Sequence, residues 1–288
     1  MRDNPRIIRE NTVTPARRIP ARDSRSAQEG TAPWWHERVV VAYLDEPPFG
    51  IRRPAGSRPA GCDMELAHHV LTVAGVATID YSLTAFAELI PGLLDGRWQM
   101  STAMFITEER AALVDFSRAI WAARDGLIVR PGDAARLRSY ESIARDAMAL
   151  LAVVRGTIQR RTALDAGIPE HRIVEYPDQG TAAAAVREGR VAAFASTAIG
   201  NRAYVESGSG LAAVADEPIG SRAASPRGAF GFSMSTPDLT AIVNSILDRY
   251  LGSPEHQALM AHYGFTSDEL PPALGRMRQG RPPRVRRT

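Results

Sequence analysis

Short apolar runs alternate with segments of helical periodicity from about residue 38 onward. The runs predict buried strands, and apolar residues that recur every three or four positions predict amphipathic helices. The expected strands cover residues 39–44, 126–130, 150–154, 173–176, 191–195 and 229–234. The expected helices cover residues 62–75, 86–94, 181–188 and 238–251. This alternation is typical of an α/β protein with mainly parallel sheets, each flanked by helices.

Breaks in the pattern divide the chain into two lobes. Pro131-Gly132 stops the strand over 126–130 and is the first candidate joint. A second series of strands and helices follows, and the strand over 229–234 leads back toward the first lobe, so that two crossings imply a hinge. The expected divisions are a disordered Arg-rich segment over 1–35, a first lobe over 36–128, a second lobe over 129–227, a return to the first lobe over 228–274 and a basic disordered tail over 275–288.

Charge is distributed unevenly along the 288 residues, whose formal net charge is +3. Residues 1–25 hold seven arginines against three acids, and residues 276–288 hold six arginines and no acid. The body of the chain, 26–275, therefore carries −7. Binding to nucleic acid needs a basic face on the folded part, so we expect no nucleic-acid partner. The basic ends fit solvated, disordered segments.

Membrane and export signals are not visible in the sequence as written. The longest apolar runs, 39–44 and 148–154, are too short to span a bilayer. The first 35 residues lack the apolar segment that a secretory signal needs, so we expect no signal peptide there. The single cysteine, Cys62, excludes an intrachain disulfide and follows no apolar segment that would indicate a lipid anchor.

Candidate ligand-binding residues follow the expected strands, because ligands of open α/β sheets collect at the carboxyl ends of strands. Glu46 and Phe49 stand in a loop after the first strand, and Pro47-Pro48 stiffens that loop. The loop therefore holds a carboxylate beside an aromatic ring. The alternative is a solvent-exposed strand exit without a ligand.

Arg110 is the candidate cation. Thr107 is expected to cap a short helix, which places Arg110 in its first turn, where the helix dipole favours anions rather than cations. An external anion bound by the guanidinium would explain this position. The alternative is a salt bridge to Glu108 or Asp115.

Gly156-Thr157 is expected to open a helix of the second lobe, where free backbone N–H groups and a hydroxyl would suit a carboxylate. Together with Glu46, Arg110 and the rings of Phe86 and Phe105 near other predicted loops, this set complements a compact zwitterion. The rings provide cation–π contacts, and arginine binds a carboxylate with two hydrogen bonds.

Signatures of enzymes are scarce by comparison. The six histidines show no metal spacing, and His68 and His69 are expected at the surface. Cys62 near His68 lacks a third orienting group, so we expect an ordinary small buried or half-buried residue. There is no Gly-x-Ser-x-Gly, P-loop or dinucleotide-binding glycine motif, and we predict no cofactor, no metal and no catalytic residue.

Several motifs occur in the order of a known family over about residues 38–270. They are Glu46-Pro47-Pro48-Phe49, Gly61-Cys62-Asp63-Met64-Glu65-Leu66-Ala67, Leu89-Ile90-Pro91-Gly92-Leu93, Ile106-Thr107-Glu108-Glu109-Arg110 and Val114-Asp115-Phe116-Ser117. The sequence thus resembles the type 3 extracellular solute-binding proteins, which serve importers of polar amino acids. Tyr176-Pro177-Asp178-Gln179 and Gly252-Ser253-Pro254-Glu255-His256, among other segments, resemble the ectoine- and hydroxyectoine-binding members.

The resemblance implies a hinged, two-lobed fold of the type II periplasmic-binding kind, which delivers a ligand to an ABC permease without turnover. It also implies an extracytoplasmic location and a monomer. Position by position, Glu46 would hold the cationic ring of the ligand and Arg110 its carboxylate. The residues that would enclose the ligand or close on it are Phe49, Phe86, Phe105, Gly156, Thr157, Ser196 and Thr197.

One position separates this chain from the binders of ordinary α-amino acids that it resembles. Such members usually carry an aspartate after the strand over 191–195 to hold the α-ammonium, and Ser196-Thr197 stand there instead. An ectoine-type solute is therefore the leading expectation. A polar amino-acid-binding protein is one alternative, and a cyclohexadienyl-dehydratase-like enzyme with Glu46 as general acid is another. The missing export signal and the Arg-rich ends also leave open a cytoplasmic ligand-sensing or interaction protein.

Overall fold

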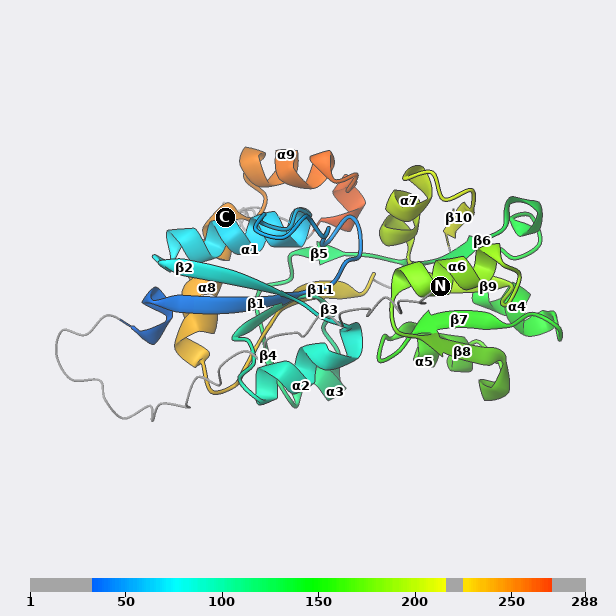
Figure 1. The fold of residues 1–288 in the computed structure, drawn as a ribbon, viewed down its shortest axis with the longest axis horizontal. Coiled ribbons are helices and arrows are strands. Elements are labelled where there is room, and N and C mark those ends of the chain that lie inside the picture. The colour runs from blue at the N-terminus through cyan, green and yellow to red at the C-terminus, as the bar shows by residue number, and fades with distance from the viewer. Residues whose placement is uncertain (1–32, 216–224, 271–288) are drawn as a thin grey trace, which may run out of the picture.

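Two β-sheets, each flanked by helices, make up the part of the chain that the structure, a computed structural model, describes (Figure 1). That part comprises residues 33–215 and 225–270. The expected disordered N-terminal segment, apart from its last three residues, and the expected basic tail lie outside it. The α/β class and the division into two lobes are confirmed.

The first sheet has the strand order β2-β1-β3-β11-β4, and β5 pairs with β11. Its strands are β1 (Arg38–Tyr43), β2 (Thr78–Leu83), β3 (Met100–Phe105), β4 (Asp115–Phe116), β5 (Trp121–Ala122) and β11 (Arg227–Phe232). The helices of this lobe are α1 (Cys62–Val73), α2 (Leu89–Leu94), α3 (Glu108–Ala111), α8 (Pro237–Tyr250) and α9 (Pro254–His262). β1 runs parallel to β2 and β3, whereas β11 runs antiparallel to all its neighbours.

The second sheet has the order β10-β6-β9-β7-β8. Its strands are β6 (Asp125–Val129), β7 (Leu151–Val154), β8 (Ile173–Tyr176), β9 (Ala193–Thr197) and β10 (Ala212–Ala215). Its helices are α4 (Tyr140–Arg145), α5 (Gln159–Asp165), α6 (Gln179–Arg187) and α7 (Ala198–Glu206). β7 is parallel to β8 and β9, whereas β6 is antiparallel to β9 and β10. Both sheets are thus mixed, because the chain enters or leaves each lobe through an antiparallel strand.

The first crossing between the lobes lies earlier than the boundary expected after residue 128. β5 ends at Ala122 in the first sheet and β6 begins at Asp125 in the second, so residues 123–124 make the crossing. Pro131-Gly132 instead begins a 3-10 turn after β6. Pro131 and Gly132 therefore mark the end of a strand and not the joint between the lobes.

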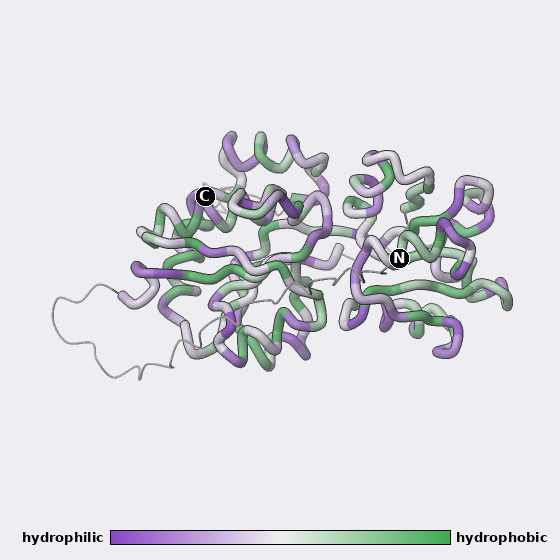
Figure 2. The backbone as a smooth tube through the Cα atoms, viewed as in Figure 1, coloured by the Kyte–Doolittle hydropathy of each residue, from purple (hydrophilic) through white to green (hydrophobic). Residues whose placement is uncertain are grey.

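Apolar side chains from the strands and the inner helix faces form a core in each lobe, and Ile199 of α7 in the second lobe joins the main cluster of the first lobe. Figure 2 shows largely hydrophobic strands inside both sheets and hydrophilic outer loops and turns. In the first lobe, Leu66 and Val70 of α1 and Leu239 and Val243 of α8 are buried in one cluster. The spacing of four residues in each pair belongs to the helical periodicity that predicted both helices.

Gly92 of α2 shows how tightly the first lobe is packed. A methyl group added there would lie 2.0 Å from the ring of Trp98, which is buried and donates its Nε1–H to Leu89 O at 2.9 Å. We expect Gly92→Ala to lower the free energy of unfolding by about 2 kcal/mol, because overpacking outweighs the roughly 1 kcal/mol by which alanine favours a helix. Urea denaturation measures this effect.

A matched control is Gly180→Ala in α6, where the new methyl group would meet only Asp178 Oδ1 at the ordinary distance of 3.4 Å. We expect this variant to be as stable as the wild type or slightly more stable. Equal stability of the two variants would contradict the packing argument.

Candidate ligand-binding site

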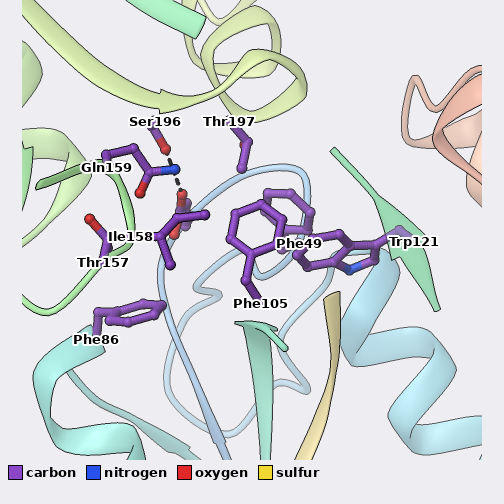
Figure 3. Close-up of a pocket in the computed structure, with 10 residues that line it drawn as sticks. Phe49, Phe86, Phe105, Trp121, Thr157, Ile158, Gln159, Ser196 and Thr197 are labelled. Atoms are coloured by element: carbon purple, nitrogen blue, oxygen red, sulfur yellow. Dashed lines mark hydrogen bonds between the residues drawn. The ribbon is translucent and has the colours of Figure 1, made fainter. Parts of the chain in front are cut away.

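A cavity lies between the two lobes at the carboxyl ends of β1, β7 and β9 (Figure 3). The space inside it that is free of protein atoms, counted together with open solvent at its mouth, is about 360 Å³. The lining residues from the first lobe are Glu46, Phe49, Phe86, Phe105 and Trp121. Those from the second lobe are Thr157, Ile158, Gln159, Ser196 and Thr197. Seven of the nine predicted site residues thus line one cavity, while Arg110 and Gly156 lie beside it.

The loop that carries Glu46 and Phe49 is held in place by its own backbone and by α1. Glu46 N–H donates to Gly50 O at 2.9 Å, and Phe49 O accepts from Asp63 N–H at 3.1 Å. Gly61, at φ +116°, allows this approach, since a methyl group there would lie 2.3 Å from Phe49 O. The start of α1 thereby fixes where the carboxylate and the ring face the cavity.

Three aromatic rings pack into one wall of the cavity. The ring centroids of Phe49 and Trp121 are 4.8 Å apart, and those of Phe105 and Trp121 are 5.2 Å apart. Trp121 is anchored from behind, because its Nε1–H donates to the buried Asp63 carboxylate at 2.9 Å. Phe86 stands apart from this group at another side of the cavity (Figure 3). The wall offers π faces to a cation.

Arg110 is a buried cation held by backbone carbonyls and a ring. As expected, Thr107 caps α3, its hydroxyl accepting from Arg110 N–H at 3.2 Å. The guanidinium donates to Phe105 O at 2.8 Å and to Gly156 O at 3.1 Å, and it lies 5.0 Å from the ring centroid of Phe86. Loss of water lowers its pKa to about 10, although Glu109 partly offsets the effect.

The alternative salt bridge of Arg110 to Glu108 or Asp115 is absent among the residues that the structure describes. The bond to Gly156 O instead links the first lobe to the second. A buried cation without a counter-ion is unfavourable unless an anion comes from outside.

Glu46 is the complementary group. Burial of its carboxyl group raises the pKa of Glu46 to about 7, an effect that a hydrogen bond from Ser196 opposes and the charge of Asp63 reinforces. Ser196 Oγ donates to Glu46 Oε1 at 3.2 Å, the contact drawn in Figure 3, which is a second link between the lobes. No arginine in the described ranges forms a salt bridge with Glu46.

The turn at Gly156-Thr157 differs from the expected helix start. α5 begins only at Gln159, because Gly156, at φ +82°, and Thr157 form a tight turn first. Thr157 N–H and its hydroxyl both donate to Val154 O, at 3.2 and 2.8 Å. The expected free donors of Thr157 are therefore used within the turn, and its side chain contributes to the cavity wall.

Ser196 and Thr197 form the end of β9 rather than the loop after it. The hydroxyl of Thr197 accepts from Gly200 N–H at 3.1 Å and so caps α7. Ser196 is the residue of this pair that reaches across to the first lobe.

Three lining residues were not predicted. Gln159 and Ile158 directly follow Gly156-Thr157, and extension of that motif by one turn would have included them. Trp121 belongs to a strand of two residues, too short for any periodic signal.

Cys62, His68 and His69, the groups considered for catalysis or metal binding, are packed against other residues of the fold. Cys62 is buried, and burial raises its pKa well above the usual value, as befits an unreactive thiol. The two histidines are half-buried rather than fully at the surface: His68 Nδ1 lies 3.0 Å from the hydroxyl of Tyr81, and His69 stacks on Tyr250. Among the described residues, no three His, Cys, Asp or Glu side chains are grouped to hold a metal ion.

Within the described ranges, every helix is too short or too polar to cross a membrane.

Comparisons with known proteins indicate the family to which this chain belongs. The sequence profile of the bacterial extracellular solute-binding proteins, family 3, matches residues 39–266. A probable amino-acid ABC transporter periplasmic-binding protein, y4tE, of Sinorhizobium fredii is 28% identical over 238 residues, which are 81% of this chain and 78% of the relative.

Solved structures share the fold. EhuB in complex with hydroxyectoine aligns with a TM-score of 0.72 and 24% identity over 80% of this chain and 90% of that one. The ancestral amino acid-binding protein AncCDT-1, a precursor of cyclohexadienyl dehydratase, aligns with a TM-score of 0.69 and 22% identity over 79% and 95% of the two chains. An ancestral arginine-binding protein bound to glutamine aligns with a TM-score of 0.68 and 22% identity over 78% and 97%.

These likenesses extend over both lobes, and the fold is the two-lobed type II periplasmic-binding fold. Since the family profile covers far more than half of its length, this chain belongs to the bacterial extracellular solute-binding proteins, family 3.

Proposed function

We propose that this protein is the substrate-binding component of an ABC importer and that it binds a small zwitterionic compatible solute, ectoine or hydroxyectoine, between its lobes. It works outside the cytoplasm as a monomer, hands the ligand to a membrane permease, and does not change it chemically. The relative from Sinorhizobium fredii carries a transporter name, which supports the importer part of the proposal.

The observation that carries the choice of ligand is a pair of opposite charges that have no counter-ions in the described part of the chain. Arg110 is 8% exposed and its guanidinium donates to two backbone carbonyls, while the enclosed carboxyl group of Glu46 accepts from Ser196. A zwitterion brings the missing carboxylate and the missing cation together. The aromatic rings of the cavity wall add cation–π stabilisation of about 0.5–2 kcal/mol for a ligand cation held against a ring face.

The second lobe favours an ectoine-type cation over an α-ammonium group. Ser196 and Thr197 supply hydroxyl groups and no carboxylate where we expect an aspartate in amino-acid binders. The positive charge of the ligand then has its carboxylate partner, Glu46, on the first lobe alone. A delocalised cationic ring lying against flat aromatic faces fits this arrangement better than a compact ammonium.

Isothermal titration calorimetry tests the proposal. We expect ectoine and hydroxyectoine to bind with a Kd in the micromolar range or below, and arginine, glutamine and glycine betaine to bind at least about tenfold more weakly, a difference of about 1.4 kcal/mol. Tight binding of an amino acid without heat from either ectoine would overturn the assignment of the ligand and leave the importer role standing.

A second candidate is a dehydratase of the cyclohexadienyl type. It is favoured by one observation, the Glu46 pKa of about 7, which suits a general acid in a cleft. Incubation with prephenate or arogenate, followed by chromatography of the products, separates the two functions. Formation of an aromatic product that stops in Glu46→Gln would establish the enzyme and refute a role in transport alone.

A further inference from the structure

Asp125 stands behind the cavity wall at the first position of β6. It pairs in register with Thr197 on β9, so it lies one strand away from the residues that close the second lobe over the cavity. Two side chains donate to its carboxylate: Gln159 Nε2 to Oδ1 at 2.7 Å, and the hydroxyl of Tyr140 to Oδ2 at 2.8 Å. Tyr140 is 1% exposed and Gln159 is 3% exposed, so both donors are held inside the lobe.

The carboxylate decides which end of the Gln159 amide faces the cavity. An ionised carboxylate accepts hydrogen bonds and cannot donate them, so the amide must turn its NH₂ group toward Asp125. Its oxygen, Oε1, then points away from Asp125. Figure 3 shows this amide at the cavity between Ser196 and Thr157.

Gln159 Oε1 is left as a free acceptor at the cavity. Among the described residues, no hydrogen bond to this atom is found. The atom is not among the fully buried polar atoms without a partner, unlike Nε2 of Gln179. The neighbouring polar groups of the second lobe are occupied: Thr157 donates to Val154 O, and Ser196 donates to Glu46. These hydroxyl groups can still accept a hydrogen bond, but Gln159 Oε1 is the carbonyl oxygen among the lining side chains of this lobe, and no hydrogen bond to it is found.

We infer that Asp125 is a positioning residue, which fixes Gln159 so that the second lobe presents a carbonyl oxygen to the cationic end of the ligand. The site thereby selects zwitterions whose cationic nitrogen carries N–H over fully alkylated ones. A quaternary ammonium has no hydrogen to donate and would leave Oε1 desolvated and unpaired. This inference rests on the proposed binding of a zwitterion and names the chemical feature that the site requires in it.

Asp125→Asn should invert the amide of Gln159. If the Tyr140 hydroxyl keeps donating as it does to Asp125, the introduced asparagine holds its oxygen toward Tyr140 and turns its NH₂ group toward Gln159. Gln159 then offers its oxygen to that NH₂ group and its own NH₂ group to the cavity. The NH₂ group of Gln159, a donor, would then face the N–H of the ligand, which is also a donor, and no hydrogen bond could form between them. We expect the Kd for ectoine at pH 8 to rise by about tenfold or more, and the preference for ectoine over glycine betaine to shrink.

The double variant Asp125→Asn/Gln159→Glu tests the role itself. The introduced glutamate would accept from the NH₂ group of the introduced asparagine with one oxygen and present the other to the ligand, so ectoine affinity should return to within about threefold of the wild type. A residue needed only for folding would show no such recovery. Asp165→Asn is the matched control, because the exposed carboxylate of Asp165 lies on α5, the helix of Gln159, and forms a salt bridge with Arg161.

Two results would overturn the inference: wild-type affinity in Asp125→Asn, or no recovery in a double variant that melts at the wild-type temperature. If the double variant is unfolded, the single variant decides. If the wild-type protein does not bind ectoine, the proposed ligand is refuted and not this inference. The same variants are then titrated with the zwitterion that does bind and whose cationic nitrogen carries N–H.

Discussion

Replacing Arg110 with alanine should raise the Kd for ectoine by about a thousandfold, close to 4 kcal/mol of binding free energy. The loss is large because the carboxylate of the ligand would enter a water-poor site and meet no cation. Arg110 is buried. In the described part of the chain, its guanidinium donates to two backbone carbonyl oxygens and makes a cation–π contact with the Phe86 ring. Calorimetric titration of the purified variant measures the change.

Two further variants separate charge from geometry. Arg110→Lys keeps a positive charge but loses the planar fork, so we expect an intermediate loss of affinity. Arg118→Ala removes an exposed arginine of the same lobe that pairs with Asp248, and we expect no change in Kd. Unchanged ectoine binding by folded Arg110→Ala would refute the assigned role.

Affinity for a cationic ligand should increase as the pH rises from about 5.5 to 8. In the empty site the Glu46 carboxyl has a pKa of about 7, so below that pH it is mostly protonated. A bound cation favours the ionised form and lowers the pKa, so binding below pH 7 releases a proton. Linkage then gives up to about a tenfold gain in affinity for each pH unit below 7 and a plateau above it.

Glu46→Gln should abolish this dependence and weaken binding at pH 8 by about a hundredfold, since the charge partner of the cation is gone. Titrations in two buffers of different ionisation enthalpy report the released proton. Asp45→Asn is the control, because Asp45 is exposed and accepts from Arg52 N–H. Affinity that falls with rising pH, or proton uptake on binding, would contradict the assignment.

The same pKa shift also affects the stability of the empty protein. Because folding raises the pKa of Glu46 from 4.5 to about 7, its ionisation disfavours the folded state. The stability that the folded state gains from holding Glu46 protonated is fully present below about pH 4.5. It declines as the pH rises through 7 and is absent above that.

Local patterns predicted elements whose apolar spacing agrees with the residues that bound them. The helix over 62–75 was found as α1, with Gly75 in the left-handed conformation expected after a helix, at φ +85°. The strand over 173–176 was found as β8 without any shift in its ends. In both, apolar spacing and the bounding residues indicated the same structure, which is the condition for a secure local prediction.

Features set by pairing between distant segments were not readable locally. β2 is half-buried along most of its length and has no strong alternation, because it lies at the edge of the first sheet. Its partner is β1, far away in sequence. Trp121 enters the cavity wall only because β5 pairs with β11, a contact that no local pattern reveals.

The sequence named most of the residues that line the cavity, but not the contacts among them. Residue types and family order indicated Glu46, Arg110 and the rings, but not that Arg110 bonds Gly156 O across the lobes. The role of Asp125 was not accessible either, because its two partners come from α4 and α5 and meet it only in the folded lobe.

All the charged and aromatic residues that line the cavity come from one lobe. Glu46 and the four rings belong to the first lobe, with Arg110 beside them, while the lining residues of the second lobe are neutral. If this cavity is the binding site, we expect a ligand to contact the first lobe before the second lobe covers it. The association rate should respond to ionic strength through the first lobe, whereas the residence time should depend on how firmly the uncharged second lobe stays closed.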